Sequence, residues 1–223
     1  QKNYYTFPKF FDWQYKSNDF YTKEYQNNFF KNKLNFKEIS NAFVLGTSPG
    51  NNYYRNILTF LPRIFFINDK TISLAIHRKS SNKFRVFLSE IFKQLNIKIK
   101  KIIYLDDDFY KFDNSKIPQF FDIFTSIKIL NKNLSYKKND KKIKIFLSRQ
   151  NSDSRNLINE NDLIDLMQSK NFKIIDTNKM SIFEQIKAFS SASVIVSATS
   201  SSLTNSVFCN KDTKIIEIIP KYR

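Results

Sequence analysis

Two arginines follow a short apolar segment in the second half of the chain and have the chemistry to bind a diphosphate. The segment at 143–147 reads Ile-Lys-Ile-Phe-Leu, Arg149 stands two residues after it, and Arg155 follows six residues later. A guanidinium presents paired N–H donors that match phosphate oxygens. If the segment is a strand of a parallel sheet, ligands bind at its carboxyl end. The alternative is an ordinary surface arginine paired with Asp153 or Glu160.

A run of four hydroxyl side chains is a second candidate anion site. Residues 199–202 read Thr-Ser-Ser-Ser and stand between an apolar segment at 194–196 and a predicted helix at 200–207. Free N–H groups and the helix dipole at a helix N-terminus attract anions, and hydroxyls add donors. The alternative is plain N-capping, which needs only one of the four.

Three consecutive aspartates at 106–108 follow a predicted strand at 102–105. Carboxylate oxygens at a strand end suit Mg²⁺ or Mn²⁺, and the alternative is a solvated acidic turn. We expect His77 to be a strand-end packing or surface residue. We expect Cys209 to be a small buried apolar residue, because no histidine near it in sequence indicates activation.

Composition excludes several classes of chemistry. The 223 residues contain one cysteine, one histidine and two glycines. This excludes a disulfide framework, a multi-cysteine zinc site, and the glycine-rich loops that bind dinucleotides or nucleoside triphosphates. The net charge of +17 predicts an anionic partner or reflects compositional drift toward Lys, Asn, Ile and Phe. Because the lysines form no defined basic block, we expect no nucleic-acid partner.

The same reading predicts a soluble, cytoplasmic protein. No apolar run reaches the roughly 20 residues of a spanning helix, and no signal-peptide core stands at the start of the chain. A lone cysteine fits a reducing compartment. The chain begins with Gln1 rather than Met, which is compatible with a piece of a longer protein.

Short apolar strands alternating with helices predict an α/β fold with parallel sheets. No element is predicted with confidence over 1–38. The polar segment 131–140 indicates a boundary between an N-terminal domain, 1–136, and a C-terminal domain, 141–223. The expected N-terminal elements are strands at 42–45, 64–67, 71–76 and 102–105, with helices at 53–63 and 81–95. The expected C-terminal elements are strands at 143–148, 172–175, 194–196 and 214–219, with helices at 159–170, 181–188 and 200–207.

The order of several motifs resembles glycosyltransferase family 61. The segment Leu147-Ser148-Arg149 is similar to the family's I-S-R, Phe183-Glu184-Gln185 contains its E-Q pair, and Leu203-Thr204-Asn205 matches its L-T-N. The family's N-Y-x-H and L-P-R motifs resemble residues 52–55 and 61–63. Further matches are Arg155, residues 158–160, residues 192–197 and the E-I-x-P strand at 217–220.

The resemblance implies a GT-B architecture of two Rossmann-like domains, with the nucleotide-sugar donor on the C-terminal domain and the acceptor on the N-terminal one. It implies an inverting transferase that needs no metal ion and no cofactor besides its donor substrate. Arg149 and Arg155 would then face the diphosphate. The other implied substrate-binding residues are Arg55, Asn159, Glu160, Gln185, Thr199, Ser200, Ser201, Ser202, Leu203, Thr204, Asn205 and Glu217.

Several positions depart from the family pattern. The family histidine of the C-terminal loop is Thr199, its two glycines are Ser200 and Ser202, and the histidine of the N-terminal motif is Arg55. An inverting transfer needs a base to deprotonate the acceptor hydroxyl, and Glu184 is the candidate that remains. Family members usually continue beyond the position of Pro220, so the resemblance also implies a truncated chain.

We therefore expect a glycosyltransferase that moves a sugar from a nucleotide sugar to a glycan or lipid-linked glycan acceptor. The expected setting is surface polysaccharide or lipopolysaccharide synthesis in the bacterial cytoplasm, with peripheral contact with the inner membrane face. The alternatives are a catalytically decayed binding or scaffold domain, a metal-dependent transferase using the aspartates at 106–108, and a basic nucleic-acid-binding protein, whose affinity would fall steeply with salt.

Overall fold

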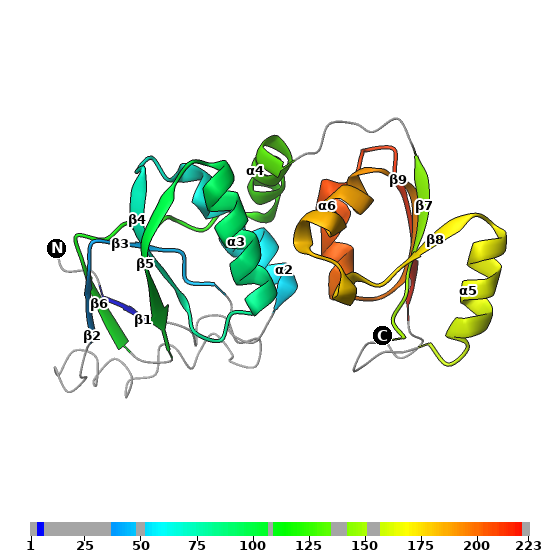
Figure 1. Ribbon diagram of the computed structural model, residues 1–223, viewed down its shortest axis with the longest axis horizontal. Helices are drawn as coiled ribbons and strands as arrows, with labels where there is room; N and C mark the ends of the chain where they lie inside the picture. Colours follow the sequence, from blue (N-terminus) through cyan, green and yellow to red (C-terminus); the bar gives the residue numbers. More distant parts are fainter. Residues whose placement is uncertain are drawn as a thin grey trace. The chain divides into compact units, whose positions relative to one another are not determined.

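The computed structural model describes residues 4–6, 37–47, 52–106, 109–134, 142–150 and 157–219 (Figure 1). Its contacts divide the chain into two compact units, Gln1–Phe121 and Asp122–Arg223, which are described separately below. Helix α4 (Ile123–Leu134) falls in the second unit because it packs against the 3₁₀ helix η6 (Ser201–Phe208). The sequence-based boundary between 136 and 141 lies on the other side of this helix.

A three-stranded parallel sheet forms the centre of the N-terminal unit. Its strands are β3 (Ala42–Val44), β4 (Thr71–His77) and β5 (Lys98–Leu105), in that order. Helix α3 (Asn82–Gln94) connects β4 to β5 and begins at Ser81, whose hydroxyl accepts a hydrogen bond from the Phe84 N–H. The buried residues of α3 recur at helical spacing, which gives the helix one apolar face.

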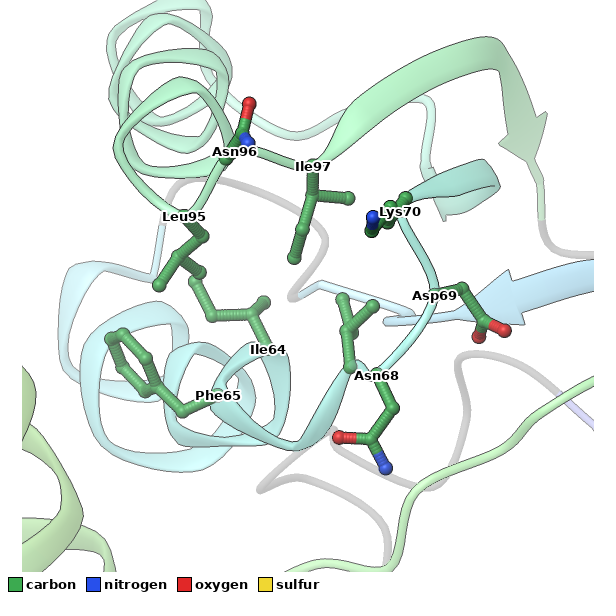
Figure 2. A pocket seen from close by; sticks show the side chains of 9 residues that line it. Ile64, Phe65, Asn68, Asp69, Lys70, Leu95, Asn96 and Ile97 are labelled. Atoms are coloured by element: carbon green, nitrogen blue, oxygen red, sulfur yellow. The ribbon is translucent and has the colours of Figure 1, made fainter.

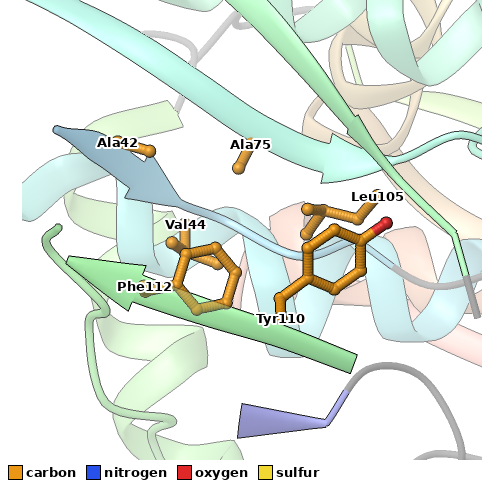
Figure 3. Close-up of a cluster of buried hydrophobic side chains, with 6 residues drawn as sticks. All are labelled: Ala42, Val44, Ala75, Leu105, Tyr110 and Phe112. Atoms are coloured by element: carbon orange, nitrogen blue, oxygen red, sulfur yellow. The ribbon is translucent and has the colours of Figure 1, made fainter. Parts of the chain in front are cut away.

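A second small sheet covers part of the first. It contains β1 (Tyr4–Thr6), β6 (Phe109–Asp113) and β2 (Lys37–Ser40), with β6 antiparallel to β1 and parallel to β2. Figure 3 shows the buried cluster between the two sheets, where Tyr110 and Phe112 of β6 meet small and branched side chains. One face of the parallel sheet is therefore covered by strands. The remaining members of the cluster are Ala42, Val44, Ala75 and Leu105.

Residues 53–66, between β3 and β4, are helical but irregular. The segment passes from α2 (Tyr53–Arg55) through the π-helix η3 (Asn56–Phe60) to the 3₁₀ helix η4 (Leu61–Phe66). The predicted helix over 53–63 is present in this irregular form, and the predicted strand over 64–67 is wrong. Pro62 has no N–H and its ring crowds the carbonyl four residues earlier, so a regular α-helix cannot run through it.

The C-terminal unit is a four-stranded parallel sheet with helices on both faces. The strand order is β10 (Lys214–Ile218), β9 (Ala192–Ala198), β7 (Ile143–Leu147), β8 (Phe172–Ile175). Figure 1 shows α5 (Glu160–Ser169) on one face and α6 (Ile182–Ser190) with η6 on the other. All four strands match the sequence-based prediction.

The mixed α/β class with parallel sheets is thus confirmed, and the pair of Rossmann-like domains in a GT-B arrangement stays a prediction. The short 3₁₀ helix η5 (Thr177–Lys179) links β8 to α6. An ordinary helix was expected over 200–207, and the structure has the 3₁₀ helix η6 (Ser201–Phe208) there. Across the described ranges, no helix is long and apolar enough to cross a membrane.

Candidate functional site

The chain reverses its direction across the C-terminal sheet between β7 and β9. From β7 it moves to β8 on one side, then crosses back to β9 and on to β10. Such a switch point opens a crevice at the carboxyl ends of the two central strands, where ligands bind in open α/β sheets. Leu147 pairs with Ser197, so the strands end at a similar level and bring Ser148 and Arg149 beside the segment after β9.

Glu160, the first residue of α5, holds the loop that follows β7. Its Oε1 atom accepts hydrogen bonds from the Ser148 hydroxyl at 2.8 Å and from the Arg149 N–H at 2.6 Å. The side chain is 4% exposed. Hydrogen bonds to a charged acceptor are stronger than neutral ones, so this carboxylate fixes the backbone at Arg149. Asn159 stands at the N-cap position without a side-chain capping bond.

Gln185 and Asn205 bond to each other inside the unit. The Asn205 Nδ2 donates to the Gln185 Oε1 at 2.8 Å, and the Gln185 Nε2 donates to the carbonyls of Thr177 at 3.0 Å and Met180 at 3.3 Å. Asn205 is 0% and Gln185 3% exposed. The family's E-Q and T-N motifs therefore supply a buried link between α6 and η6. The family resemblance implied that both residues contact the substrate. In the structure, the side-chain amides of both form hydrogen bonds inside the unit, which is consistent with a role in positioning the loop after β9.

The other residues of the loop 199–204 fall into two groups: some contact other parts of the C-terminal unit, and others have hydroxyl groups without a described partner. Ser202 shares a hydrogen bond of 2.7 Å with Thr177, Leu203 packs on the sheet core, and Thr204 is buried. The hydroxyl oxygens of Thr199 and Ser200 are buried and have no hydrogen-bond partner among the described residues. Ser201, the first residue of η6, is exposed. Among the described side chains of this loop, the unsatisfied hydroxyls are thus the two nearest the end of β9; elsewhere in the described chain, the Ser126 hydroxyl is also buried without a partner.

The candidate base Glu184 forms the capping box that its spacing from Ser181 predicted. Its carboxylate accepts the Ser181 N–H at 2.7 Å, and the Ser181 hydroxyl accepts the Glu184 N–H at 3.2 Å. The residue is exposed. Glu217 lies exposed on the edge strand β10, opposite Ser197.

The other two predicted arginines do not belong to the described part of the C-terminal unit. Arg55 belongs to the N-terminal unit, where its N–H donates to the Asn52 side chain at 3.1 Å. Arg155 lies outside the described residues. Arg149 is therefore the predicted diphosphate ligand whose surroundings the structure describes, and it is half-buried.

Asp106 is surrounded by cations and a phenol. Its carboxylate pairs with the Lys37 Nζ at 2.9 Å and the Arg78 Nη1 at 3.7 Å, and accepts a hydrogen bond from the Tyr110 hydroxyl. Burial, together with that hydrogen bond, raises the pKa of Tyr110. Asp107 and Asp108 lie outside the described residues, and no group of three potential metal ligands comes together among the residues described.

His77 and Cys209 have the packing roles expected of them. The Nδ1 atom of buried His77 accepts the Lys79 N–H at 3.1 Å. Burial raises the pKa of the Cys209 thiol to about 12, so it is protonated at neutral pH.

Arg63, which the sequence reading did not single out, is fully buried in the N-terminal unit. Its guanidinium donates to the carbonyls of Leu45 at 2.6 Å, Val44 at 3.3 Å and Pro118 at 2.5 and 3.0 Å. It also lies over the Phe120 ring, 4.3 Å from its centroid. The arginine of the L-P-R motif therefore anchors the chain just after β3. Its position in a predominantly apolar stretch was the signal that could have indicated burial.

Residues 53–216 match the family model described as Glycosyltransferase 61. The match covers well over half of the chain, including the L-P-R segment, the switch point and most of β10. No curated protein matches the chain.

Proposed function

The chain belongs to glycosyltransferase family 61 and is a glycosyltransferase, and on this premise we propose that it takes its sugar from a nucleotide-sugar donor. In this proposal the C-terminal unit binds the donor and the N-terminal unit binds a glycan or lipid-linked glycan acceptor. The setting is surface polysaccharide or lipopolysaccharide synthesis at the cytoplasmic face of a bacterial inner membrane, and the configuration at the transferred carbon is inverted.

One observation carries the proposed donor site. Within the part of the chain that the structure describes, the buried hydroxyl oxygens of Thr199 and Ser200 have no hydrogen-bond partner. They stand after β9, where the sheet has its switch point with β7. Buried polar atoms in proteins are normally hydrogen-bonded. A diphosphate in this crevice would accept hydrogen bonds from both hydroxyls and from Arg149, which Glu160 holds at the end of β7.

The proposed chemistry follows from these donors. The acceptor oxygen attacks the anomeric carbon, the bond from that carbon to the diphosphate oxygen breaks, and negative charge develops on the diphosphate. Arg149, Arg155 and the two hydroxyls stabilise this charge in place of a metal ion. The proton of the acceptor hydroxyl passes to a carboxylate, for which Glu184 stays the candidate.

The second candidate function is a binding or scaffold domain that has lost catalysis. It is supported by the replacement of the family's histidine and glycines by Thr199, Ser200 and Ser202. Glycine would let a phosphate approach the backbone closely, whereas the Ser202 hydroxyl is already bonded to Thr177.

A thermal-shift panel with UDP-, GDP-, CMP- and ADP-sugars tests the donor site, because a ligand of the folded state raises the melting temperature. We expect a shift with one nucleotide class that is lost in Arg149→Ala and kept in Arg78→Ala, which removes an exposed arginine. No shift with any donor would contradict the proposal. A shift without transfer to any acceptor would favour the binding-domain alternative.

A further inference from the structure

Two adjoining pockets open at the amino ends of β4 and β5, the edge of the N-terminal sheet opposite to the carboxyl ends. The smaller has a volume of about 150 Å³ and the larger about 540 Å³. They share Lys70, Asn96 and Ile97. Neither pocket contains a residue of the proposed donor site, so the two pockets form a separate candidate site.

The smaller pocket has an apolar floor. Figure 2 shows the side chains of Ile64, Leu95 and Ile97 pointing toward a common space. Ile67 also lines it, and Leu95 is one of the exposed large apolar residues of the protein. The acidic residue that lines the smaller pocket, Asp69, forms an ion pair with the Lys116 Nζ at 2.5 Å. The floor therefore offers apolar surface without a free negative charge.

The larger pocket is cationic. Lys70, Lys93 and Lys98 line it together with Ser89 and Asn96, and none of the described residues that line it is acidic. Three positively charged side chains from residues that line one pocket lower the free energy of an anion bound there. Lysine ammoniums, together with hydroxyl and amide donors, are common phosphate ligands in proteins.

The C-terminal end of α3, which borders both pockets, has two of its last carbonyls hydrogen-bonded. Asn96 adopts a left-handed conformation with φ 55°, the Ile97 N–H donates to the Phe92 carbonyl at 2.9 Å, and the Asn96 N–H donates to the Lys93 carbonyl at 3.1 Å. This Schellman arrangement satisfies carbonyls that would otherwise point free at the helix end. The Lys98 N–H donates to the Lys70 carbonyl at 2.8 Å, which ties the two lysine-bearing segments together.

We propose that the two pockets together bind a phosphate-bearing amphiphile. The phosphate lies among Lys70, Lys93 and Lys98, and the beginning of the apolar chain rests on the floor formed by Ile64, Ile67, Leu95 and Ile97. The shared residues Lys70, Asn96 and Ile97 make the cationic and apolar halves continuous. The site does not depend on the proposed donor chemistry.

The test compares three probes by titration calorimetry on the full chain. They are dihexanoyl phosphatidic acid below its micelle concentration, dihexanoyl phosphatidylcholine, and inorganic phosphate. We expect the phosphatidic acid to bind at least tenfold more tightly than either of the others. If inorganic phosphate binds as tightly as the phosphatidic acid, the smaller pocket does not bind the apolar chain. If phosphatidylcholine binds as tightly, the lysines of the larger pocket do not select an anionic phosphate. No binding of the phosphatidic acid would overturn both.

Two triple variants distinguish binding at this site from nonspecific attraction to the positive charge of the protein. Lys70→Gln/Lys93→Gln/Lys98→Gln should weaken phosphatidic acid binding at least tenfold. The control, with Lys128, Lys132 and Lys173 changed to Gln, removes the same charge from exposed positions of the other unit and should keep it. Equal loss in both variants would overturn the proposal. The nucleotide-sugar thermal shift should be unchanged in the pocket variant, so the two proposals fail or succeed separately.

Discussion

Replacing Arg63 by alanine should destabilise the N-terminal unit by about 3–5 kcal/mol. The guanidinium makes four hydrogen bonds to three main-chain carbonyls. Each buried carbonyl left without a partner costs about 1–3 kcal/mol, and the vacated volume adds a cavity term. Because a domain's total stability is about 5–15 kcal/mol, the change should remove a large part of it.

The charge of Arg63 sets the expected pH dependence. Burial lowers the pKa of the Arg63 guanidinium to about 10, so the group stays protonated at neutral pH. The shift corresponds to a desolvation cost of about 3 kcal/mol, which the hydrogen bonds must offset. The unfolded state binds more protons than the folded state only between about pH 10 and the ordinary pKa of arginine, so stability rises with pH in that window alone. The effect of Arg63→Ala should therefore be constant between pH 6 and pH 9.

Urea unfolding followed by circular dichroism measures this effect, and hydrogen exchange of β3 and β4 amides assigns it to the N-terminal unit. Arg63→Lys keeps a charge but loses the planar fork, so it should still cost about 2 kcal/mol or more. Arg78→Ala is the control: it removes an exposed guanidinium with an ion pair at 3.7 Å and should cost less than about 1 kcal/mol. An Arg63→Ala protein within 1 kcal/mol of the original would refute the reasoning.

Three further predictions concern the C-terminal unit. Asn205→Ala leaves the buried Gln185 oxygen without its donor, so urea unfolding should show a loss of about 1–3 kcal/mol that is not additive with Gln185→Ala; additive losses would contradict the buried link. Glu160→Ala should weaken donor binding about tenfold by releasing Arg149, whereas Glu160→Gln, which keeps an acceptor oxygen, should largely preserve it; equal calorimetric affinities for both variants would argue against the loop-fixing role. With its thiol pKa raised to about 12, Cys209 should react with iodoacetamide at pH 8 about a thousandfold more slowly than a free cysteine, and rapid labelling of the folded protein would contradict its burial.

The sequence predicted the C-terminal sheet well because the pattern there is strong. Strands β7 and β9 are short, nearly continuous apolar runs, which is typical of strands buried on both faces. In contrast, β2 reads Lys-Glu-Ile-Ser and has a mostly exposed pattern, so nothing local distinguishes it from a loop. Its pairing with β6, some 70 residues later, supplies the structure.

The same limit applies to the site residues: local sequence patterns predict which element a residue follows, but not which distant residue its side chain contacts. Alternation of strands and helices was enough to predict that Arg149 and Thr199 follow strands of a parallel sheet, and the structure adds that these two strands are neighbours. It could not show that Gln185 and Asn205 satisfy each other, because their bond joins residues 20 positions apart. Nor could it separate Arg63 from a surface arginine, since the carbonyls that it binds lie on segments distant in sequence.

The central claim is that a nucleotide diphosphate binds at the switch point between β7 and β9. An NMR titration of the ¹⁵N-labelled chain with the free nucleoside diphosphates tests it most directly, because each backbone amide reports its own surroundings. We predict that the largest shifts with the preferred nucleotide fall on Arg149, Thr199, Ser200 and Ser201. Saturable shifts confined to other parts of the chain, or none at millimolar nucleotide, would contradict the assignment of this crevice as the donor site.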